Sequence, residues 1–135
     1  MLLKIKIIYL QSQQTMTTNK EDVEKYLKDL KFKIGIFGIY IRDDRGKNAQ
    51  ALLDLDITPN KRKEIIIALN PDDYSEGPME EKLNNLLPMW VFGTQVKKQE
   101  VYIKVSMGAI DSKAICISFH LAEHPIHYPF KKRTL

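Results

Sequence analysis

The sequence predicts an α+β domain in which an N-terminal helix and a helix pair pack on a small, twisted, mainly antiparallel sheet. Its first half carries apolar residues at helical spacing, and its second half alternates apolar with polar residues, as strands do. The length of 135 residues suits one domain. We expect that domain to span residues 16–135. Residues 1–15 are either an extension from an upstream start codon or an added edge strand.

The first predicted helix begins at residues 18–21, Thr-Asn-Lys-Glu, whose spacing is that of a capping box. Apolar residues then recur at i, i+3, i+4 and i+7 from Val23 to Leu30, so one stripe of this helix should face the core. We expect the helix to end near Phe32. The following run, Ile34–Ile41, is rich in isoleucine and aromatic residues and predicts a strand closed by a turn.

Two shorter helices should follow. The first spans Asn48 to Leu55, and the second begins at Thr58-Pro59, where proline takes the first helical position because its missing amide costs nothing there. This second helix should stop at Asn70-Pro71. Residues 72–78 consist of turn formers and predict a surface loop.

Three strands complete the predicted sheet, at Met89–Gly93, Glu100–Ser106 and Ala114–His120. Side chains alternate between the two faces of a strand. The expected core-facing residues of the last two strands are Val101, Ile103, Val105, Ile115, Ile117 and Phe119. The expected residues of the opposite, polar face are Glu100, Tyr102, Lys104, Ser106, Ala114, Cys116, Ser118 and His120.

If the last two strands pair in antiparallel fashion, their apolar faces align only when the numbers of two opposed residues sum to an even value. The short connection between the strands favours a sum of about 220. This register places Glu100 opposite His120 and Tyr102 opposite Ser118. A slip of two residues would keep the faces and change the partners. Either way, Glu100, Tyr102, Lys104 and His120 should converge on one site, because opposed side chains are close neighbours.

The three histidines, His120, His124 and His127, all fall within eight residues. Histidine exchanges protons near neutral pH, and a basic tail at residues 131–133 follows, so acid–base groups and anion-binding groups lie close together. The chain carries 21 Lys plus Arg against 17 Asp plus Glu, a net charge of +4 that favours an anionic partner. These features point to phosphate chemistry.

RNA cleavage fits this set of groups, because it needs a base for the 2′-hydroxyl, a cation for the phosphate and an acid for the departing 5′-oxygen. We assign His120 as general acid or base, Tyr102 as the group that positions or protonates at the scissile phosphate, and Lys104 as the stabilising cation. The expected supporting residues are Glu100, Tyr74, His124 and His127. The expected RNA-binding residues are Arg42, Arg45, Lys131, Lys132 and Arg133.

A metal site is the competing hypothesis, since His120, Glu123, His124 and His127 offer ligands within a short span. The spacing argues against it, because Pro125 breaks any helix that would align them and no HExxH or paired-cysteine motif is present. The sequence also lacks a phosphate-binding glycine loop and a Gly-x-Ser-x-Gly elbow. We therefore expect no metal and no small-molecule cofactor.

The single cysteine, Cys116, excludes a disulfide framework and favours a reducing compartment. Its apolar neighbours indicate a packed residue rather than a nucleophile. The N-terminal apolar run is interrupted by Lys4 and Lys6 and is far shorter than a membrane span, so it is a poor signal peptide and a poor anchor. These observations predict a cytoplasmic protein that does not engage a membrane.

Four ordered motifs, at Asn70–Pro78, Met89–Gly93, Glu100–Lys104 and Cys116–His120, resemble those of the MqsR (motility quorum-sensing regulator) toxins of bacterial type II toxin–antitoxin systems. The resemblance extends from about residue 16 to residue 132. It implies a RelE-like fold and an mRNA interferase, a small basic endoribonuclease that cuts transcripts without the ribosome. It also implies a cognate antitoxin protein as partner, beside the RNA substrate.

By position, the resemblance matches Tyr102 to a family active-site tyrosine, and places His120 where the best-known members carry a catalytic lysine after Ser-Phe. Two positions depart from the family: Ser75 replaces an active-site lysine, and Val91 replaces a glutamine. Either this branch has moved its catalysis to Lys104 and the histidines, or its cleavage is weak. The alternative from another functional class is a non-catalytic module that binds RNA or a regulatory protein.

Overall fold

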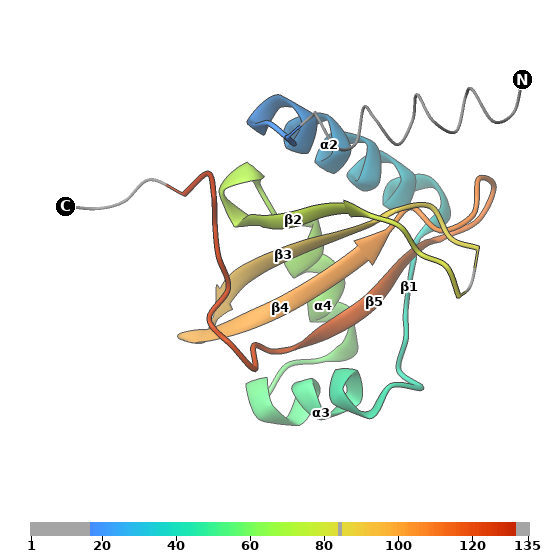
Figure 1. The fold of residues 1–135 in the computed structure, drawn as a ribbon. Coiled ribbons are helices and arrows are strands. Elements are labelled where there is room, and N and C mark those ends of the chain that lie inside the picture. The colour runs from blue at the N-terminus through green and yellow to red at the C-terminus, as the bar shows by residue number, and fades with distance from the viewer. Residues whose placement is uncertain (1–16, 84, 132–135) are drawn as a thin grey trace, which may run out of the picture.

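The computed structural model describes residues 17–83 and 85–131 (Figure 1). Over these residues, three α-helices accompany one five-stranded mixed sheet in the order β1-β5-β4-β3-β2, which confirms the α+β class. Strand β1 runs parallel to β5, and the other neighbours are antiparallel. The elements are α2 (Lys20–Phe37), β1 (Ile39–Ile41), α3 (Gly46–Leu55), α4 (Pro59–Ile67), the 3₁₀ turn η1 (Pro71–Asp73), β2 (Tyr74–Met79), β3 (Met89–Val96), β4 (Gln99–Ser106) and β5 (Ala114–Leu121). The predicted extension at residues 1–15 lies outside the described residues.

Helix α2 differs from its prediction at both ends. Its N-cap is Asn19 rather than Thr18, and the Asn19 side chain and the Asp22 carboxylate form a reciprocal capping box. The helix continues to Phe37, so the strand predicted from residue 34 is wrong except for β1. Burial explains the difference, because Ile34 extends the apolar stripe into the core and outweighs the strand preference of isoleucine. Gly38, at φ 84°, then ends the helix.

The next elements confirm one expectation and correct two. Pro59 does open α4, and α3 begins at Gly46 rather than Asn48. The surface loop predicted over residues 72–78 is wrong, because Asp72 and Asp73 belong to η1 and the chain from Tyr74 onward forms strand β2. Strand β2 is an edge strand with two register shifts against β3, and such strands tolerate glycine and proline that a central strand excludes.

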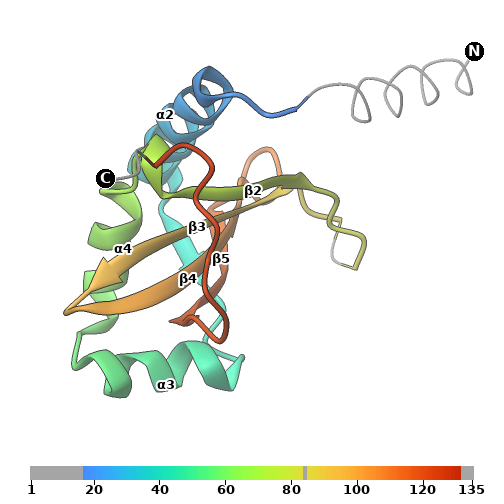
Figure 2. The same cartoon turned by 60° about the vertical axis from the view of Figure 1, so that its left-hand side comes forward.

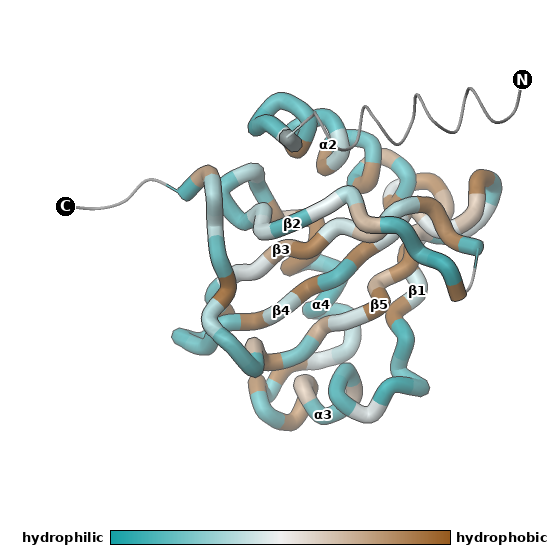
Figure 3. Tube along the Cα trace, viewed as in Figure 1, coloured by the Kyte–Doolittle hydropathy of each residue, from teal (hydrophilic) through white to brown (hydrophobic). Residues whose placement is uncertain are grey.

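The hydrophobic core lies on one face of the sheet, where α2 and α4 pack (Figures 1 and 2). Hydrophobic residues concentrate in the central strands, whereas the turn between β1 and α3 is hydrophilic (Figure 3). The predicted inward residues of β4 are confirmed as fully buried: Val101, Ile103 and Val105. Among the described residues, no helix is both long enough and apolar enough to cross a membrane.

Strands β4 and β5 pair in a register shifted by two residues from the favoured one. Tyr102 lies opposite His120, and Lys104 lies opposite Ser118, so the predicted Glu100–His120 pair is wrong. A β-bulge follows, because the next pair joins Val105 to Cys116. The extra residue reverses the alternation of β5. Cys116 and Ala114 therefore face the core, whereas the sequence placed both on the polar face.

The side chain of Asn48 in α3 satisfies the backbone at this bulge. Its Nδ2 donates to the carbonyl oxygen of Ile117 at 3.0 Å, and its Oδ1 accepts from the amide of Phe119 at 2.9 Å. Asn48 is only 1% exposed, so these groups have no access to bulk water. The helix thereby holds β5 in the register that pairs Tyr102 with His120.

Residues 125–131, which we name the C-terminal strap, cross the sheet face opposite the core helices (Figure 2). The strap approaches β3 at Gly93, where a Cβ would overlap the Tyr128 hydroxyl and lie 2.7 Å from Cδ1 of Ile126. The Glu100 carboxylate secures it by accepting from the Tyr128 hydroxyl at 2.8 Å and from the Ile126 amide at 3.2 Å. The strap covers one end of this face and leaves the rest open.

Candidate active site

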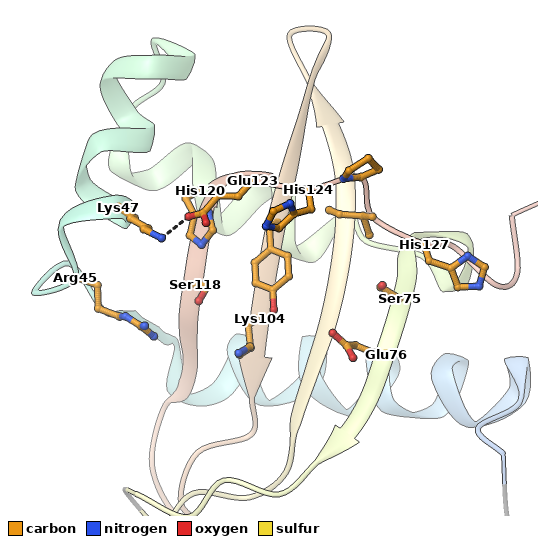
Figure 4. Close-up of a pocket in the computed structure, with 13 residues that line it drawn as sticks. Arg45, Lys47, Ser75, Glu76, Lys104, Ser118, His120, Glu123, His124 and His127 are labelled. Atoms are coloured by element: carbon orange, nitrogen blue, oxygen red, sulfur yellow. Dashed lines mark hydrogen bonds and ion pairs between the residues drawn. The ribbon is translucent and has the colours of Figure 1, made fainter.

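The open part of this face contains a hollow of about 680 Å³, which we call the sheet hollow (Figure 4). Its floor is formed by β4 and β5. Its walls come from the start of α3, from β2 and from the chain that follows β5. The lining residues are Arg45, Lys47, Ser75, Glu76, Tyr102, Lys104, Ser118, His120, Glu123, His124, Pro125, Ile126 and His127.

Tyr102 and His120 form a ring stack on the floor of the sheet hollow. Their ring centroids are 5.4 Å apart and the ring planes differ by 21°. The Nδ1 atom of His120 lies 2.9 Å from the carbonyl oxygen of Leu121. Because a carbonyl oxygen only accepts, this contact requires a proton on Nδ1 and leaves Nε2 as the atom that exchanges protons.

Lys104 completes the predicted catalytic group on the same face. Its Nζ lies 5.9 Å from the centroid of the Tyr102 ring, and over the described chain it has no ion-pair partner. Burial raises the pKa of Tyr102 and the nearby carboxylate of Glu76 raises it further, while Arg45 opposes the shift. The phenol therefore stays protonated at neutral pH and acts as a hydrogen-bond donor.

Three cations and two carboxylates line the sheet hollow, with Lys104 on the floor and Arg45, Lys47, Glu76 and Glu123 on the walls. Lys47 and Glu123 neutralise each other as an ion pair, which holds the pKa of Glu123 below its usual range. Arg45 forms no ion pair within the described chain and extends toward the floor (Figure 4). With Lys104 it supplies positive charge for an anionic ligand, and Glu76 stands on the opposite side.

The turn that carries Arg45 is anchored from the core side of the molecule. Arg62 of α4 is 2% exposed and donates to both carboxylate oxygens of Asp43, at 2.6 and 3.0 Å. Hydrogen bonding to this guanidinium holds the pKa of Asp43 below its usual range, although partial burial opposes the shift. The bidentate pair fixes the approach of the turn to α3.

The two remaining histidines lie at the margin of the sheet hollow. His124 and His127 are exposed, and His127 lies beyond Ser75 at the far side (Figure 4). Across residues 17–83 and 85–131, no three His, Cys, Asp or Glu side chains are close enough together to hold a metal ion. The four residues considered as a metal site therefore do not form a ligand cluster.

Two residues that were predicted to support catalysis, Glu100 and Tyr74, make structural contacts instead. Glu100 binds the strap and does not line the sheet hollow. Tyr74 is buried on the core side, where its ring stacks on Phe130 at 5.4 Å and its hydroxyl donates to the carbonyl oxygen of Gly77 at 2.6 Å. Burial raises the pKa of Tyr74, consistent with this enclosed position.

The predicted RNA-binding residues are dispersed. Arg45 lines the sheet hollow, whereas Arg42 pairs with Asp44 at 3.0 Å outside it. Lys131 lies on the strap, with its Nζ 5.0 Å from the centroid of the Tyr128 ring. Lys132 and Arg133 lie outside the described residues.

Sequence reasoning gave no catalytic, supporting or RNA-binding role to five polar residues that line the sheet hollow: Lys47, Ser75, Glu76, Ser118 and Glu123. Ser118 shared the predicted polar face of β5, so strand alternation was the signal for it. Ser75 and Glu76 gave no such signal, because their segment reads as a loop. Val91, the second departure from the MqsR pattern, is fully buried on β3 opposite Lys104.

The cysteine has no part in this site. Cys116 faces the core, is fully buried, and burial raises the pKa of its thiol to about 12. The reading of Cys116 as a packed residue is confirmed. No protein-family model, curated protein or solved structure gives a significant match to this chain.

Proposed function

We propose that this chain is the toxin of a type II toxin–antitoxin system, a ribosome-independent mRNA interferase that cleaves single-stranded RNA without a metal ion. The observation that carries the proposal is the stack of Tyr102 on His120, with Lys104 on the same floor of an open, cation-walled hollow. The resemblance of the motifs to MqsR toxins and their RelE-like fold supports the same conclusion. It also favours a cytoplasmic location and an antitoxin partner.

The sheet hollow suits a flexible polyanion. Single-stranded RNA presents unpaired bases to aromatic rings and phosphates to cations. The Tyr102–His120 stack supplies the rings, and Arg45 and Lys104 supply the cations. Because stacking on these rings needs unpaired bases, the proposed substrate is single-stranded.

The proposed reaction is an intramolecular transesterification. The 2′-oxygen bonds to phosphorus as the bond from phosphorus to the 5′-oxygen breaks, which yields a 2′,3′-cyclic phosphate and a free 5′-hydroxyl. One proton leaves the 2′-hydroxyl and another reaches the 5′-oxygen. Nε2 of His120 performs one of these transfers. The protonated phenol of Tyr102 positions the phosphate or protonates it, and Lys104 stabilises the charge that grows on its oxygens.

The test compares His120→Ala with Lys63→Ala, an exposed site on α4 far from the sheet hollow. Each protein is purified in parallel and incubated with end-labelled single-stranded RNA in the presence of a chelator. We expect His120→Ala to lose about 10²–10⁴-fold in rate, the usual contribution of one acid–base group. We expect Lys63→Ala to cleave like the parent, and thermal melting should show both variants folded.

Other outcomes separate the alternatives. Undiminished cleavage by folded His120→Ala would reject the assignment of this residue. Loss of parental cleavage on chelation would indicate a metal enzyme. Salt-sensitive RNA binding without cleavage would instead support a non-catalytic RNA-binding module, because binding through phosphates weakens as salt rises.

A further inference from the structure

We propose that Glu76 is the second proton-transfer group of this site: its carboxylate takes the proton of the 2′-hydroxyl, and His120 gives a proton to the departing 5′-oxygen. The inference rests on the proposed RNA cleavage and deepens it. It assigns each transfer to one residue and adds a catalytic group that neither the motifs nor the strand alternation identifies.

The first argument is that Glu76 is available. Its side chain is exposed and projects from β2 into the sheet hollow (Figure 4). Within residues 17–83 and 85–131 it takes part in no hydrogen bond and no ion pair. The other carboxylates nearby are occupied, since Glu123 pairs with Lys47 and Glu100 binds the strap. Glu76 is thus the lining carboxylate with no structural partner in the described chain.

The second argument is position. Glu76 pairs with Val91 and Val91 with Lys104, so the β4 groups lie between β2 and the strand of His120. Three strand spacings of about 4.8 Å separate the backbones of β2 and β5 by about 14 Å. Glu76 and His120 side chains that lean in from either side therefore leave space for one phosphodiester above Tyr102 and Lys104.

Tyr102, on β4, lies between the strands that carry the two groups. Its ring stacks on His120, and the charge of Glu76 is one cause of its raised pKa. The imidazole therefore contacts the phenol and the carboxylate acts on it through its charge, although the two groups come from strands on opposite sides of β4.

The chemistry needs this arrangement. In an in-line displacement the attacking and departing oxygens lie on opposite sides of phosphorus, so one group cannot serve both at once. The 2′-oxygen–phosphorus bond forms as its proton passes to Glu76. The bond from phosphorus to the 5′-oxygen breaks as the His120 imidazolium supplies a proton to that oxygen. Glu76 ends protonated and His120 neutral, and exchange with solvent restores both.

The experiment uses two RNA substrates that differ at one atom: the ordinary strand, and one in which sulfur replaces the 5′-bridging oxygen at the cleaved position. A thiolate leaves without a proton, so the sulfur substrate needs no general acid but still needs a base. We compare Glu76→Gln, His120→Ala and the matched control Glu80→Gln, an exposed carboxylate outside the sheet hollow.

We expect Glu76→Gln to lose about 10²-fold or more in kcat on both substrates, with little change in KM. His120→Ala should lose cleavage of the ordinary substrate and recover most of it on the sulfur substrate. Glu80→Gln should match the parent on both. Melting curves must show that all three variants fold.

Three results would overturn the inference, and they differ in what else they reject. If Glu76→Gln cleaves like the parent while His120→Ala fails, the role of Glu76 is wrong and the proposed nuclease stands. If sulfur rescues Glu76→Gln but not His120→Ala, the two roles are reversed. If the parent protein cleaves neither substrate, the proposed function and this inference fall together.

Discussion

The two faces of strand β4 place neighbouring residues in opposite environments. Ile103 on one face is fully buried in the core, whereas its neighbour Lys104 on the other face is half-buried and lacks an ion-pair partner in the described chain. Tyr102 likewise makes no hydrogen bond within residues 17–83 and 85–131. The core-facing side chains of β4 are packed in the interior, whereas the Lys104 amine and the Tyr102 hydroxyl on the other face have no ion-pair or hydrogen-bond partner in the described chain. Stability and the proposed reactivity are therefore assigned to alternate residues of one strand.

The largest expected effect tests this division directly. Ile103→Ala should lower the free energy of unfolding by about 2–5 kcal/mol, because it removes fully buried methyl groups and leaves a cavity. Lys104→Ala, one residue away, should change it by about 0.5 kcal/mol or less and lower RNA cleavage instead. Urea unfolding of both variants measures the contrast. Equal destabilisation by the two changes would show that the faces are not divided in this way.

The second test concerns Asn48, which holds β5 in its register with β4. Asn48→Ala leaves the carbonyl of Ile117 and the amide of Phe119 buried without partners, at a cost of about 1–3 kcal/mol. Because β5 then loses its anchor, we also expect the Tyr102–His120 stack to loosen and cleavage to fall. Gln50→Ala, an exposed change in the same helix, is the control. A melting temperature for Asn48→Ala equal to that of the control would contradict the role of Asn48.

The smallest expected effect concerns the C-terminal strap, which covers one end of the sheet face that carries the sheet hollow. Tyr128→Phe removes one hydrogen bond to Glu100 and should cost about 0.5–1.5 kcal/mol. Burial, and then the hydrogen bond and charge of Glu100, raise the pKa of Tyr128. The folded state therefore keeps the phenolic proton when the unfolded chain has lost it, and this contribution to stability declines as pH rises above about 10. Urea unfolding at neutral and alkaline pH should show the difference between parent and variant shrinking, whereas a constant difference would argue against the shifted pKa.

The sequence predicted β4 well because its alternation has no interruption from Val101 to Val105. The same rule failed in the part of β5 that precedes Ser118, since a bulge adds one residue there, and Ala114 and Cys116 face the core instead of the polar face. The bulge depends on Asn48, which is 69 or more residues away along the chain, so no local pattern announces it. Long-range packing therefore decided which residues of β5 face the core.

The candidate site was predictable to the same extent as its strands. Alternation brought Tyr102, Lys104 and His120 to one face, and the structure places them together. Glu76 was missed because Ser75, Gly77 and Pro78 are turn formers, and only pairing with β3 makes their segment a strand. Glu100 was included wrongly because alternation sets the face of a side chain and not its partner, which here is the strap.

The ion pair between Arg62 and Asp43 links helix α4 to a residue of the opposite surface. Arg45 follows Asp43 by two positions. The buried guanidinium of Arg62 therefore helps to fix the position of Arg45, a proposed phosphate-binding residue. If the proposed RNA site is right, we expect a substitution of Arg62 to alter RNA affinity although Arg62 does not line the sheet hollow. Since the pKa of Asp43 is lowered, the tether persists into acid and is released only as the pH falls through that lowered value.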